Sequence, residues 1–522
     1  MKKLQHEIPK GDPRGRMIFG KAFRSLIYVA VGVVSMPWIS QNLMAGAADV
    51  TVNLASTKQE IDGFGASSAW CGTVPSSVMN ALYGDLGFSI LRLRIEEGIG
   101  DNWKAGPYSS WAPELANAKA ASAKGALVFA TPWNPPASLR LTGGGGKYST
   151  DPSKWASYRD YLNAYVKYMK DNGVNLHAIS VQNEPDYSKD WTYWTPTQAH
   201  DFVLNYGATI NTKLISAESF NFSKNMYDQI LNDSKALANV SIMGMHLYGT
   251  SVINFAYPLF ESKGRPAGKK LWMTEHYIGE KETDQGPANT AAIGKEIHDC
   301  MVTGNMSGYT YWWITWPNGL ATGSGTIYQR AYAIGQFSKF IRPGYFRVDA
   351  TAAPATGVNV SAYSGAGKIV IVAVNSGTGA VSQKFTVQGG SVAQFASYQT
   401  ASGKNMVAGA AVAVAGGSFT ASLPAQSITT FVGTNTTIGV RSQAADLVGK
   451  LKFTYRDGAY WVGSLGQESG TLRVVAVDGR EVESRQIPSG VLETRLETNR
   501  SGVYLIEVKQ GSLSGTTSIA IP

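Results

Sequence analysis

The chain has 522 residues, 44% of them hydrophobic and 16% charged, a composition that supports large buried cores and excludes a disordered chain. The formal net charge is +9, but residues 1–47 carry seven basic and two acidic residues and no dense basic run follows, so we expect no nucleic-acid partner. The two cysteines, Cys71 and Cys300, exclude a disulfide framework or a cysteine-rich zinc module, and whether they pair with each other stays open.

The N-terminus has the order of a secretory signal peptide. A basic stretch precedes the apolar run of residues 26–34, and Ala45-Gly46-Ala47 provides a cleavage site of small residues. The alternative is a retained membrane anchor, but the run is well under the roughly 20 residues that a membrane span needs. We therefore predict that residues 1–47 are removed and that the mature protein, without a membrane span, is secreted or held at the cell surface.

Between residues 60 and 340, short apolar runs alternate with longer stretches of helical periodicity. In residues 155–169, for example, apolar side chains recur at helical spacing, after a start signal at Asp151-Pro152 and before a stop signal at Gly173. Eight alternating units predict an α/β fold, a (β/α)8 TIM barrel with its active site at the carboxyl ends of the strands. The predicted strands are residues 61–66, 90–94, 126–131, 178–183, 214–218, 242–248, 270–275 and 308–313.

The segments on either side of the barrel are predicted to be β-structure. Short β-like runs fill residues 341–433, and we expect them to form an attached β-sandwich side domain that an early strand in residues 48–59 joins. Residues 434–444 are a predicted linker, and residues 445–522 a small C-terminal all-β module.

Two glutamates end apolar strand-like runs at opposite sides of the predicted barrel mouth. Glu184 follows the fourth run and Glu275 ends the seventh, positions where a carboxylate is costly unless it faces a cleft. Glycosidic bonds are cleaved by one protonated and one ionised carboxyl group, and a pair about 5 Å apart works by double displacement with retention. The alternative is that each glutamate only pairs with a nearby arginine.

Aromatic residues are frequent on and just after the predicted strand ends. One tryptophan alone is best explained by core packing, but several beside two carboxylates predict a carbohydrate cleft, because aromatic rings stack on the C–H faces of sugars. The residues are Trp133, Trp191, Trp194, Trp312, Trp313, Trp316, Tyr187, Tyr193, Tyr248 and Tyr277.

Two long motifs resemble a known enzyme family. Residues 179–187 read I-S-V-Q-N-E-P-D-Y and residues 271–275 read L-W-M-T-E, and both closely resemble glycoside hydrolase family 30, in particular its bacterial glucuronoxylanase-like xylanases. Residues 337–345 and 423–431 are also similar to that branch, so the resemblance covers roughly residues 50–433. It implies Glu184 as the acid/base and Glu275 as the nucleophile, with no metal or organic cofactor.

The resemblance also implies roles for residues around the glutamates. Asn183 is expected to bind the sugar 2-hydroxyl, Tyr248 to contact the nucleophile, and Arg94 to support the carboxylates, while Trp133 and Trp312 line the sugar subsites. The complete set of predicted substrate-binding residues is Asn183, Trp133, Tyr248, Trp312, Arg94, Tyr187 and Trp316.

The chain departs from the family after the eighth strand. Glucuronoxylanases grip the carboxylate of a glucuronic acid branch there with an arginine and a tyrosine, but Trp316 and Asn318 stand at those positions. A carboxylate is best held by a bidentate cation, which an indole cannot replace. We therefore predict xylan cleavage that does not require the branch. The alternative, a glucuronoxylan-specific enzyme, needs an arginine or lysine from another loop.

The C-terminal module shows a separate likeness. Residues 472–482 and 502–508 resemble a C-terminal sorting domain of type IX secretion, and the alternative is an ordinary β accessory module. Taken together, the sequence predicts a monomeric, secreted, retaining endo-β-1,4-xylanase whose partner is xylan. Three alternatives stay open. The chain could be a retaining glycosidase for another β-glycan, such as a β-1,6-glucan or galactan, an exo-acting enzyme, or a carbohydrate-binding surface protein without catalysis.

Overall fold

The computed structural model describes residues 47–522 except 99, 188, 280–284, 317, 437–440, 444–451, 457–458, 464–468, 477–479, 492, 498–501, 511–512 and 522. The predicted signal peptide therefore lies outside the described residues apart from residue 47, and so does much of the predicted linker. None of the helices in the described part of the chain has the length and hydropathy needed to cross a membrane.

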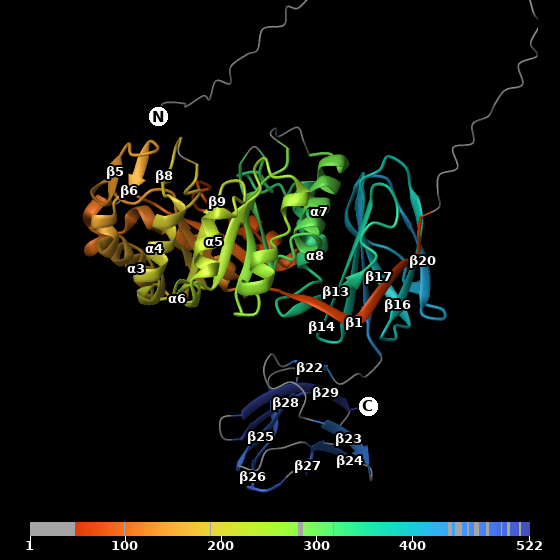
Figure 1. Ribbon diagram of the computed structural model, residues 1–522. Coiled ribbons are helices and arrows are strands. Elements are labelled where there is room, and N and C mark those ends of the chain that lie inside the picture. Colours follow the sequence, from red (N-terminus) through yellow and green to blue (C-terminus); the bar gives the residue numbers. More distant parts are fainter. Residues whose placement is uncertain are drawn as a thin grey trace, which may run out of the picture. The chain divides into compact units, whose positions relative to one another are not determined.

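Eight parallel strands close into a barrel, which confirms the predicted fold (Figure 1). Each predicted run contains one strand, with bounds that differ by a few residues. Residue 61 belongs to the preceding strand, and the fourth barrel strand ends at Ser180, so Asn183 and Glu184 lie in the loop after it. In chain order the strands are β2 (Gly63–Ser67), β3 (Ile90–Ile95), β4 (Leu127–Pro132), β7 (Ala178–Ser180), β9 (Lys213–Ser219), β10 (Ile242–His246), β11 (Lys270–His276) and β12 (Gly308–Trp313).

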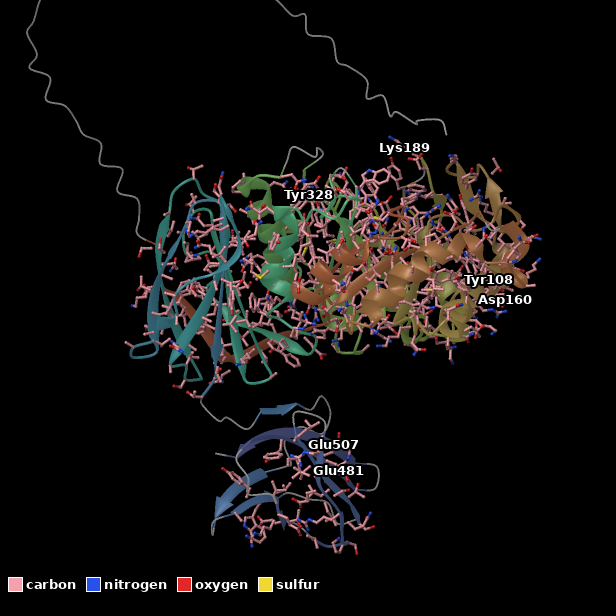
Figure 2. All side chains as sticks on the ribbon, turned by 180° about the vertical axis from the view of Figure 1, so that it is seen from behind. Tyr108, Asp160, Lys189, Tyr328, Glu481 and Glu507 are labelled. Carbon is pink, nitrogen blue, oxygen red and sulfur yellow. The ribbon has the colours of Figure 1, made fainter. Side chains whose placement is uncertain are left out.

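Amphipathic helices surround the barrel. In α3 (Trp155–Asp171) the apolar residues predicted from periodicity, among them Tyr161 and Met169, are buried, while Asp160 on the other face is exposed (Figure 2). The start signal is also present, because the Asp151 carboxylate accepts a hydrogen bond from the Ser153 amide. The other helices are α1 (Ser76–Met79), α2 (Ala112–Ser122), α4 (Pro196–Tyr206), α5 (Asn225–Asn232), α6 (Ser234–Asn239), α7 (Pro287–Val302) and α8 (Gln329–Ser338).

The inside of the barrel changes from apolar to polar along the strands. An apolar cluster near the strand starts contains Ile90, Phe129, Ala178, Ile215, Ile242 and Trp272. Side chains on one face of a strand recur every second residue, so the next inward positions of β3 and β4 belong to Arg92 and Thr131. This polar layer is buried, and it lies directly below the two glutamates.

The side domain is a β-structure that packs against the barrel. Its strands run in the order β18-β17-β21-β15-β14-β13-β1-β16-β20, with β19 beside β17. One face encloses an apolar core of its own, while Val370, Val372 and Ile428 on the other belong to the barrel's core. The strands are β1 (Val50–Ile61), β13 (Tyr345–Ala350), β14 (Val358–Gly365), β15 (Lys368–Asn375), β16 (Val381–Gln388), β17 (Gln394–Ala401), β18 (Lys404–Ala408), β19 (Val412–Ala413), β20 (Ser418–Leu423) and β21 (Ser427–Thr434).

The C-terminal segment is all-β, as predicted, with a five-stranded and a three-stranded sheet. Leu472, Val474, Ile487 and Ile506 are among the residues of its small apolar core. Its strands are β22 (Arg441–Gln443), β23 (Lys452–Arg456), β24 (Ala459–Gly463), β25 (Gly470–Ala476), β26 (Glu481–Ile487), β27 (Glu493–Arg495), β28 (Gly502–Gln510) and β29 (Leu513–Ile521). The two cysteines are both free thiols: Cys300 is buried in α7, and Cys71 follows β2.

Candidate active site

The two glutamates meet at the carboxyl ends of the strands. A carboxylate oxygen of Glu184, a ring nitrogen of His246 and a carboxylate oxygen of Glu275 all lie within 4.8 Å of one another. Both glutamates are only 4% exposed. Glu184 has a φ of 44°, in the left-handed region, and its amide donates to the carbonyl of Glu218 at 3.0 Å. Such strained backbone is typical of residues that a fold holds in place for a function.

Glu275 is held by two donors. Arg92 Nη1 lies 2.5 Å from its Oε2, and the Tyr248 hydroxyl donates to its Oε1 at 2.9 Å. These contacts fix the orientation of the carboxylate. The contact predicted for Tyr248 is therefore present in the structure.

Glu184 has a different environment. Trp191 Nε1 donates to its Oε2 at 2.9 Å, and His246 Nδ1 lies 3.0 Å from its Oε1. Burial raises the pKa of Glu184, and the charge of Glu275 raises it further, against the hydrogen bond from His246. A carboxyl group with a raised pKa is suited to donate a proton, which is the task of the acid in acid/base chemistry.

A third carboxylate, Glu218, lies in the layer below. Arg92 Nη2 is 3.2 Å from its Oε1, and the Thr131 hydroxyl donates to its Oε2 at 2.9 Å. Burial alone raises a carboxyl pKa, but the charges of Arg92 and His246 outweigh it and lower the pKa of Glu218 to about 2. Its contribution to stability is thus fully present above the ordinary glutamate range and is lost as the pH falls toward 2.

His246 lies between the three carboxylates and is fully buried. Its Nε2 is 3.7 Å from Glu218 and 3.8 Å from Glu275. Burial lowers the pKa of His246, but the charges of Glu275 and Glu184 outweigh burial and raise it to about 9. The imidazole is therefore protonated at neutral pH and offers two N–H donors.

The spacing of Glu184, His246 and Glu275 would also allow a shared metal ion. A metal ligand must present a lone pair, and a protonated imidazole has none. The guanidinium of Arg92, in contact with Glu275, adds a second positive charge at the same place. The positive charges of Arg92 and His246 beside the two glutamates therefore suit an acid/base centre.

The support predicted for Arg94 is provided by Arg92, which corrects that expectation. Arg94 pairs with Glu96, and its guanidinium lies 4.4 Å from the centre of the Trp70 ring. Both arginines face the same side of β3, but a strand rises about 3.3 Å per residue, so the side chains differ in depth. Arg92 reaches the carboxylates, and Arg94 lies farther along the strand, near the rim.

This correction predicts unequal effects of matched substitutions. Arg92→Gln should lower the free energy of unfolding by about 3–5 kcal/mol, because it leaves the Glu218 carboxylate buried without its charge partner. Arg94→Gln should cost about 1 kcal/mol or less, as expected for a partly exposed pair. Urea unfolding followed by tryptophan fluorescence measures both. Equal losses would show that the Arg92–Glu218 pair is not the stabilising contact.

Asn183 is positioned beside the glutamates. Its side-chain oxygen accepts from Arg92 Nη2 at 2.7 Å, which fixes the amide orientation. Its Nδ2 is buried and has no acceptor among the residues that the structure describes. A donor left free beside the catalytic pair suits a sugar hydroxyl, so the role expected for Asn183 stays a prediction.

Four tryptophans lie together next to the carboxylates. Ring centres of Trp133 and Trp312 are 5.7 Å apart, and Trp70 lies 4.8 Å from Trp133 and 6.1 Å from Trp191. Trp70 was not among the predicted residues, although it follows a barrel strand as the others do. Its φ of 57° belongs to a turn that the sequence does not reveal. Trp70 is 36% exposed, so part of the residue is open to solvent beside the other tryptophans.

A second aromatic row leads outward from Trp312. Trp313 lies 4.7 Å from Trp312 and 4.9 Å from Trp316, and Trp316 is 45% exposed. On another side of the site, Phe220 stacks between Tyr187 and Tyr248, with ring centres 4.7 Å and 5.1 Å away. The predicted aromatic residues Tyr187 and Trp316 therefore lie on rows of rings that lead to the site.

The loop after β12 presents no cationic fork in its described part. Asn318 is buried, and its carbonyl accepts a hydrogen bond from Arg330 Nη1 at 2.5 Å. Arg330 is fully buried, so its guanidinium forms hydrogen bonds inside the loop. Among the large hydrophobic side chains in the described part of this loop, Trp316 is exposed.

The chain is similar to several xylanases. It is 44% identical over 398 residues to a glucuronoxylanase of Bacillus subtilis, XynC, covering 74% of this chain and 92% of the relative. A family 30 endoxylanase from Clostridium papyrosolvens C71 shares 64% identity and a TM-score of 0.71 over 74% of this chain and all of that one. A family 30 subfamily 8 xylanase from Clostridium acetobutylicum shares 47% identity and a TM-score of 0.70, over 74% and 99%. No family model matches the chain.

Proposed function

The chain belongs to the xylanases of glycoside hydrolase family 30, and from this premise we propose that it hydrolyses internal β-1,4 bonds of xylan with retention of configuration. The observation that carries the proposal is the pair of buried glutamates, each with a carboxylate oxygen within 4.8 Å of one from the other. That spacing matches the short separation of retaining glycosidases and leaves little room for the water that an inverting enzyme places between its carboxylates.

In the first half of the reaction, Glu275 attacks the anomeric carbon and the glycosidic C–O bond breaks. Glu184 gives its proton to the departing oxygen, so the leaving chain is released as a neutral alcohol. Burial favours the protonated form of Glu184, because it raises the pKa of this carboxyl group. Arg92 and Tyr248 each hold one oxygen of Glu275 and so fix the direction of its attack.

In the second half, water replaces the enzyme on the sugar. Glu184, now ionised, takes a proton from the water, whose oxygen attacks the same carbon from the opposite face. The ester bond to Glu275 breaks, and both carboxyl groups return to their initial states. Two inversions leave the product with the configuration of the substrate.

The protonated His246 adjusts the charge balance during these steps. It contacts Glu184 and lies 3.8 Å from Glu275, so its positive charge compensates whichever carboxylate is ionised. The proton leaves Glu184 when Glu275 loses its negative charge to the ester, and the buried cation makes this exchange less costly.

The proposed substrate is an unbranched stretch of xylan. Trp316 provides a ring face, and no charged donor, where glucuronoxylanases bind the branch carboxylate. Product analysis on glucuronoxylan, arabinoxylan and linear xylooligosaccharides tests this specificity. We expect comparable cleavage of all three. The rival assignment, which the glucuronoxylanase relative favours, predicts cleavage of glucuronoxylan alone, at fixed distances from each branch.

The terminal segments complete the proposal. The basic, apolar and small-residue order of residues 1–47 supports export, which places the enzyme where polysaccharide is found. The all-β C-terminal module is proposed to act as a sorting domain of type IX secretion, on the likeness of residues 472–482 and 502–508. Catalysis itself requires only the barrel and its side domain, as a monomer.

A further inference from the structure

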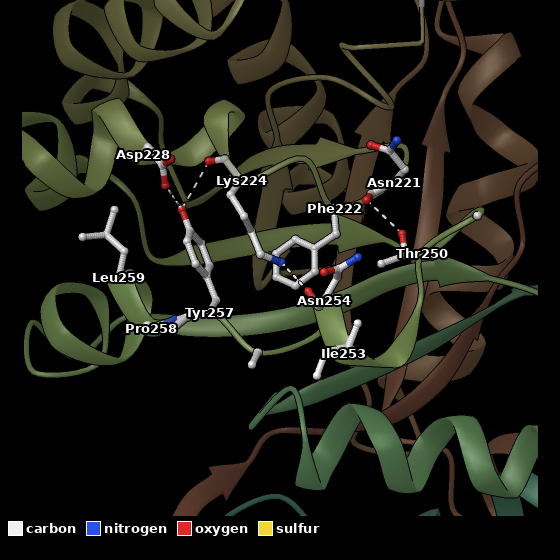
Figure 3. Close-up of a pocket in the computed structure, with 12 residues that line it drawn as sticks. Asn221, Phe222, Lys224, Asp228, Thr250, Ile253, Asn254, Tyr257, Pro258 and Leu259 are labelled. Carbon is white, nitrogen blue, oxygen red and sulfur yellow. Dashed lines mark hydrogen bonds between the residues drawn. The ribbon is translucent and has the colours of Figure 1, made fainter.

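A cavity of about 560 Å³ lies outside the catalytic pair, since neither glutamate is among its lining residues (Figure 3). The loops that follow β9 and β10 form it. Its lining combines aromatic and aliphatic side chains with amides, a hydroxyl and one lysine. Its lining includes Asn221, Phe222, Lys224, Thr250, Asn254 and Tyr257, with Ile253 at the edge.

Lys224 has an unusual environment for a cation. Its ammonium lies 2.8 Å from the centre of the Phe222 ring and 5.1 Å from that of Tyr257, and it donates to the carbonyl of Asn254 at 2.8 Å (Figure 3). Within the described parts of the chain, no carboxylate lies within 4.0 Å of it. Asp228, the nearby acid, accepts a hydrogen bond from the Tyr257 hydroxyl at 2.6 Å.

This arrangement leaves positive charge uncompensated. An ammonium has three N–H donors, and a half-buried cation without a counter-ion is costly. Burial accordingly lowers the pKa of Lys224 to about 7, which the charge of Asp228 only partly offsets. A bound anion would remove the cost, because it would supply the missing charge and accept the remaining hydrogen bonds.

The other lining residues restrict what kind of anion fits. Phe222, Tyr257 and Ile253 offer apolar surface, and the Ile253 side chain is 81% exposed at the edge. Asn221 and Asn254 contribute amides that can pair with hydroxyl groups. A ligand with C–H faces, several hydroxyls and one carboxylate matches this mixture, and a simple inorganic anion does not use the apolar part.

The cavity and the wall of the active site are built from the same two loops. Phe220 stacks on Tyr248, which donates to Glu275, and the cavity residues Asn221 and Thr250 lie one and two positions further along the two loops. A branch of a polysaccharide seated over Glu275 would extend along these two loops to enter the cavity. It is a different place from the loop after β12, where Trp316 and Asn318 lie.

We infer that this cavity binds a uronic acid residue carried by the polysaccharide, with Lys224 as the cation that holds its carboxylate. The inference rests on the proposed function only in taking the acidic sugar to be a branch of the chain that the enzyme hydrolyses. Such a contact tethers acidic branches on the rim without making them a condition for cleavage, because Lys224 touches neither glutamate.

The test is the binding of glucuronate to the full-length protein, measured by calorimetry or ligand-observed NMR at low salt. Lys224→Gln should weaken it at least about tenfold, the effect of losing a charge-assisted hydrogen bond. Lys235→Gln, which removes an exposed lysine of α6, is the matched control and should leave affinity unchanged. Glucose has the hydroxyls and C–H faces without the carboxylate, and acetate has the carboxylate without the sugar ring. Both should therefore bind more weakly than glucuronate.

A charge pair at Ile253 gives a second test that leaves the buried residues untouched. Ile253→Lys should strengthen glucuronate binding and Ile253→Glu should weaken it, by several-fold each. Equal affinity in the Lys224→Gln and unaltered proteins, absence of glucuronate binding, or acetate binding as tight as glucuronate would each overturn the inference. Hydrolysis of linear xylohexaose by Lys224→Gln should stay unchanged. The two proposals can fail separately. If the protein binds glucuronate through Lys224 but cleaves no xylan, the proposed function is refuted and the assignment of the cavity stands.

Discussion

Replacing Glu275 with glutamine is expected to lower kcat on xylan at least about 10⁴-fold, while the protein stays folded and binds polysaccharide. The amide has the size of the carboxylate but cannot attack the anomeric carbon, so no glycosyl-enzyme forms. Arg92 keeps its second partner, Glu218, at 3.2 Å, and the buried layer stays paired. Steady-state kinetics, with circular dichroism and a polysaccharide pull-down, measure the three quantities.

A matched variant and a rescue experiment separate the nucleophile from a structural role. Glu96→Gln changes a carboxylate that pairs with Arg94 on the rim and should alter kcat by less than about tenfold. In Glu275→Ala, added azide can occupy the vacated space and attack an activated aryl xyloside directly. One displacement inverts configuration, so we expect an α-glycosyl azide. Near-normal hydrolysis by Glu275→Gln would exclude this residue as the nucleophile.

Replacing Glu184 with glutamine should have the second largest effect, and it should depend on the leaving group. Hydrolysis of xylan is expected to fall by about 10²- to 10⁴-fold, because a sugar alkoxide leaves poorly without a proton. A dinitrophenyl xylobioside needs no such proton, so it should still form the glycosyl-enzyme and release a burst of dinitrophenol. Stopped-flow absorbance at the dinitrophenolate band measures the burst.

The comparison between the two variants assigns the roles. After the burst, Glu184→Gln should turn over slowly, because no base activates the water, and azide should accelerate turnover and give the β-glycosyl azide. Glu275→Gln should show no burst on the same substrate. If Glu184→Gln loses its activity on the aryl substrate as completely as its activity on xylan, Glu184 is not the acid.

Much of the fold is predictable because it depends on local patterns. Strands buried on both faces read as short apolar runs, so all eight barrel strands stand out, and each predicted run contains one. A charged residue that ends such a run is conspicuous, which is why Glu184 and Glu275 are found without knowledge of the barrel. The remaining error is in bounds: β7 ends at Ser180 because the chain turns toward the left-handed Glu184.

The deeper parts of the site depend on three-dimensional contacts that patterns do not encode. Arg92 and Arg94 have the same side-chain direction on β3, and only the stagger of neighbouring strands decides which one reaches Glu275. Glu218 also ends a predicted strand, so the signal was present, but its pairing with Arg92 crosses the barrel. The position of Trp70 depends on its own left-handed backbone conformation in a loop. A residue other than glycine gives no sequence signal for that conformation.

The most direct measurement is the anomeric configuration of the product first released from linear xylohexaose, recorded by proton NMR before mutarotation. One spectrum reports whether an unbranched chain is cleaved and whether its configuration is kept. We predict shorter xylooligosaccharides whose new reducing ends appear first as the β-anomer. An α-anomer that appears first would contradict the double displacement by Glu275 and Glu184, and intact xylohexaose beside cleaved glucuronoxylan would contradict the branch-independent specificity.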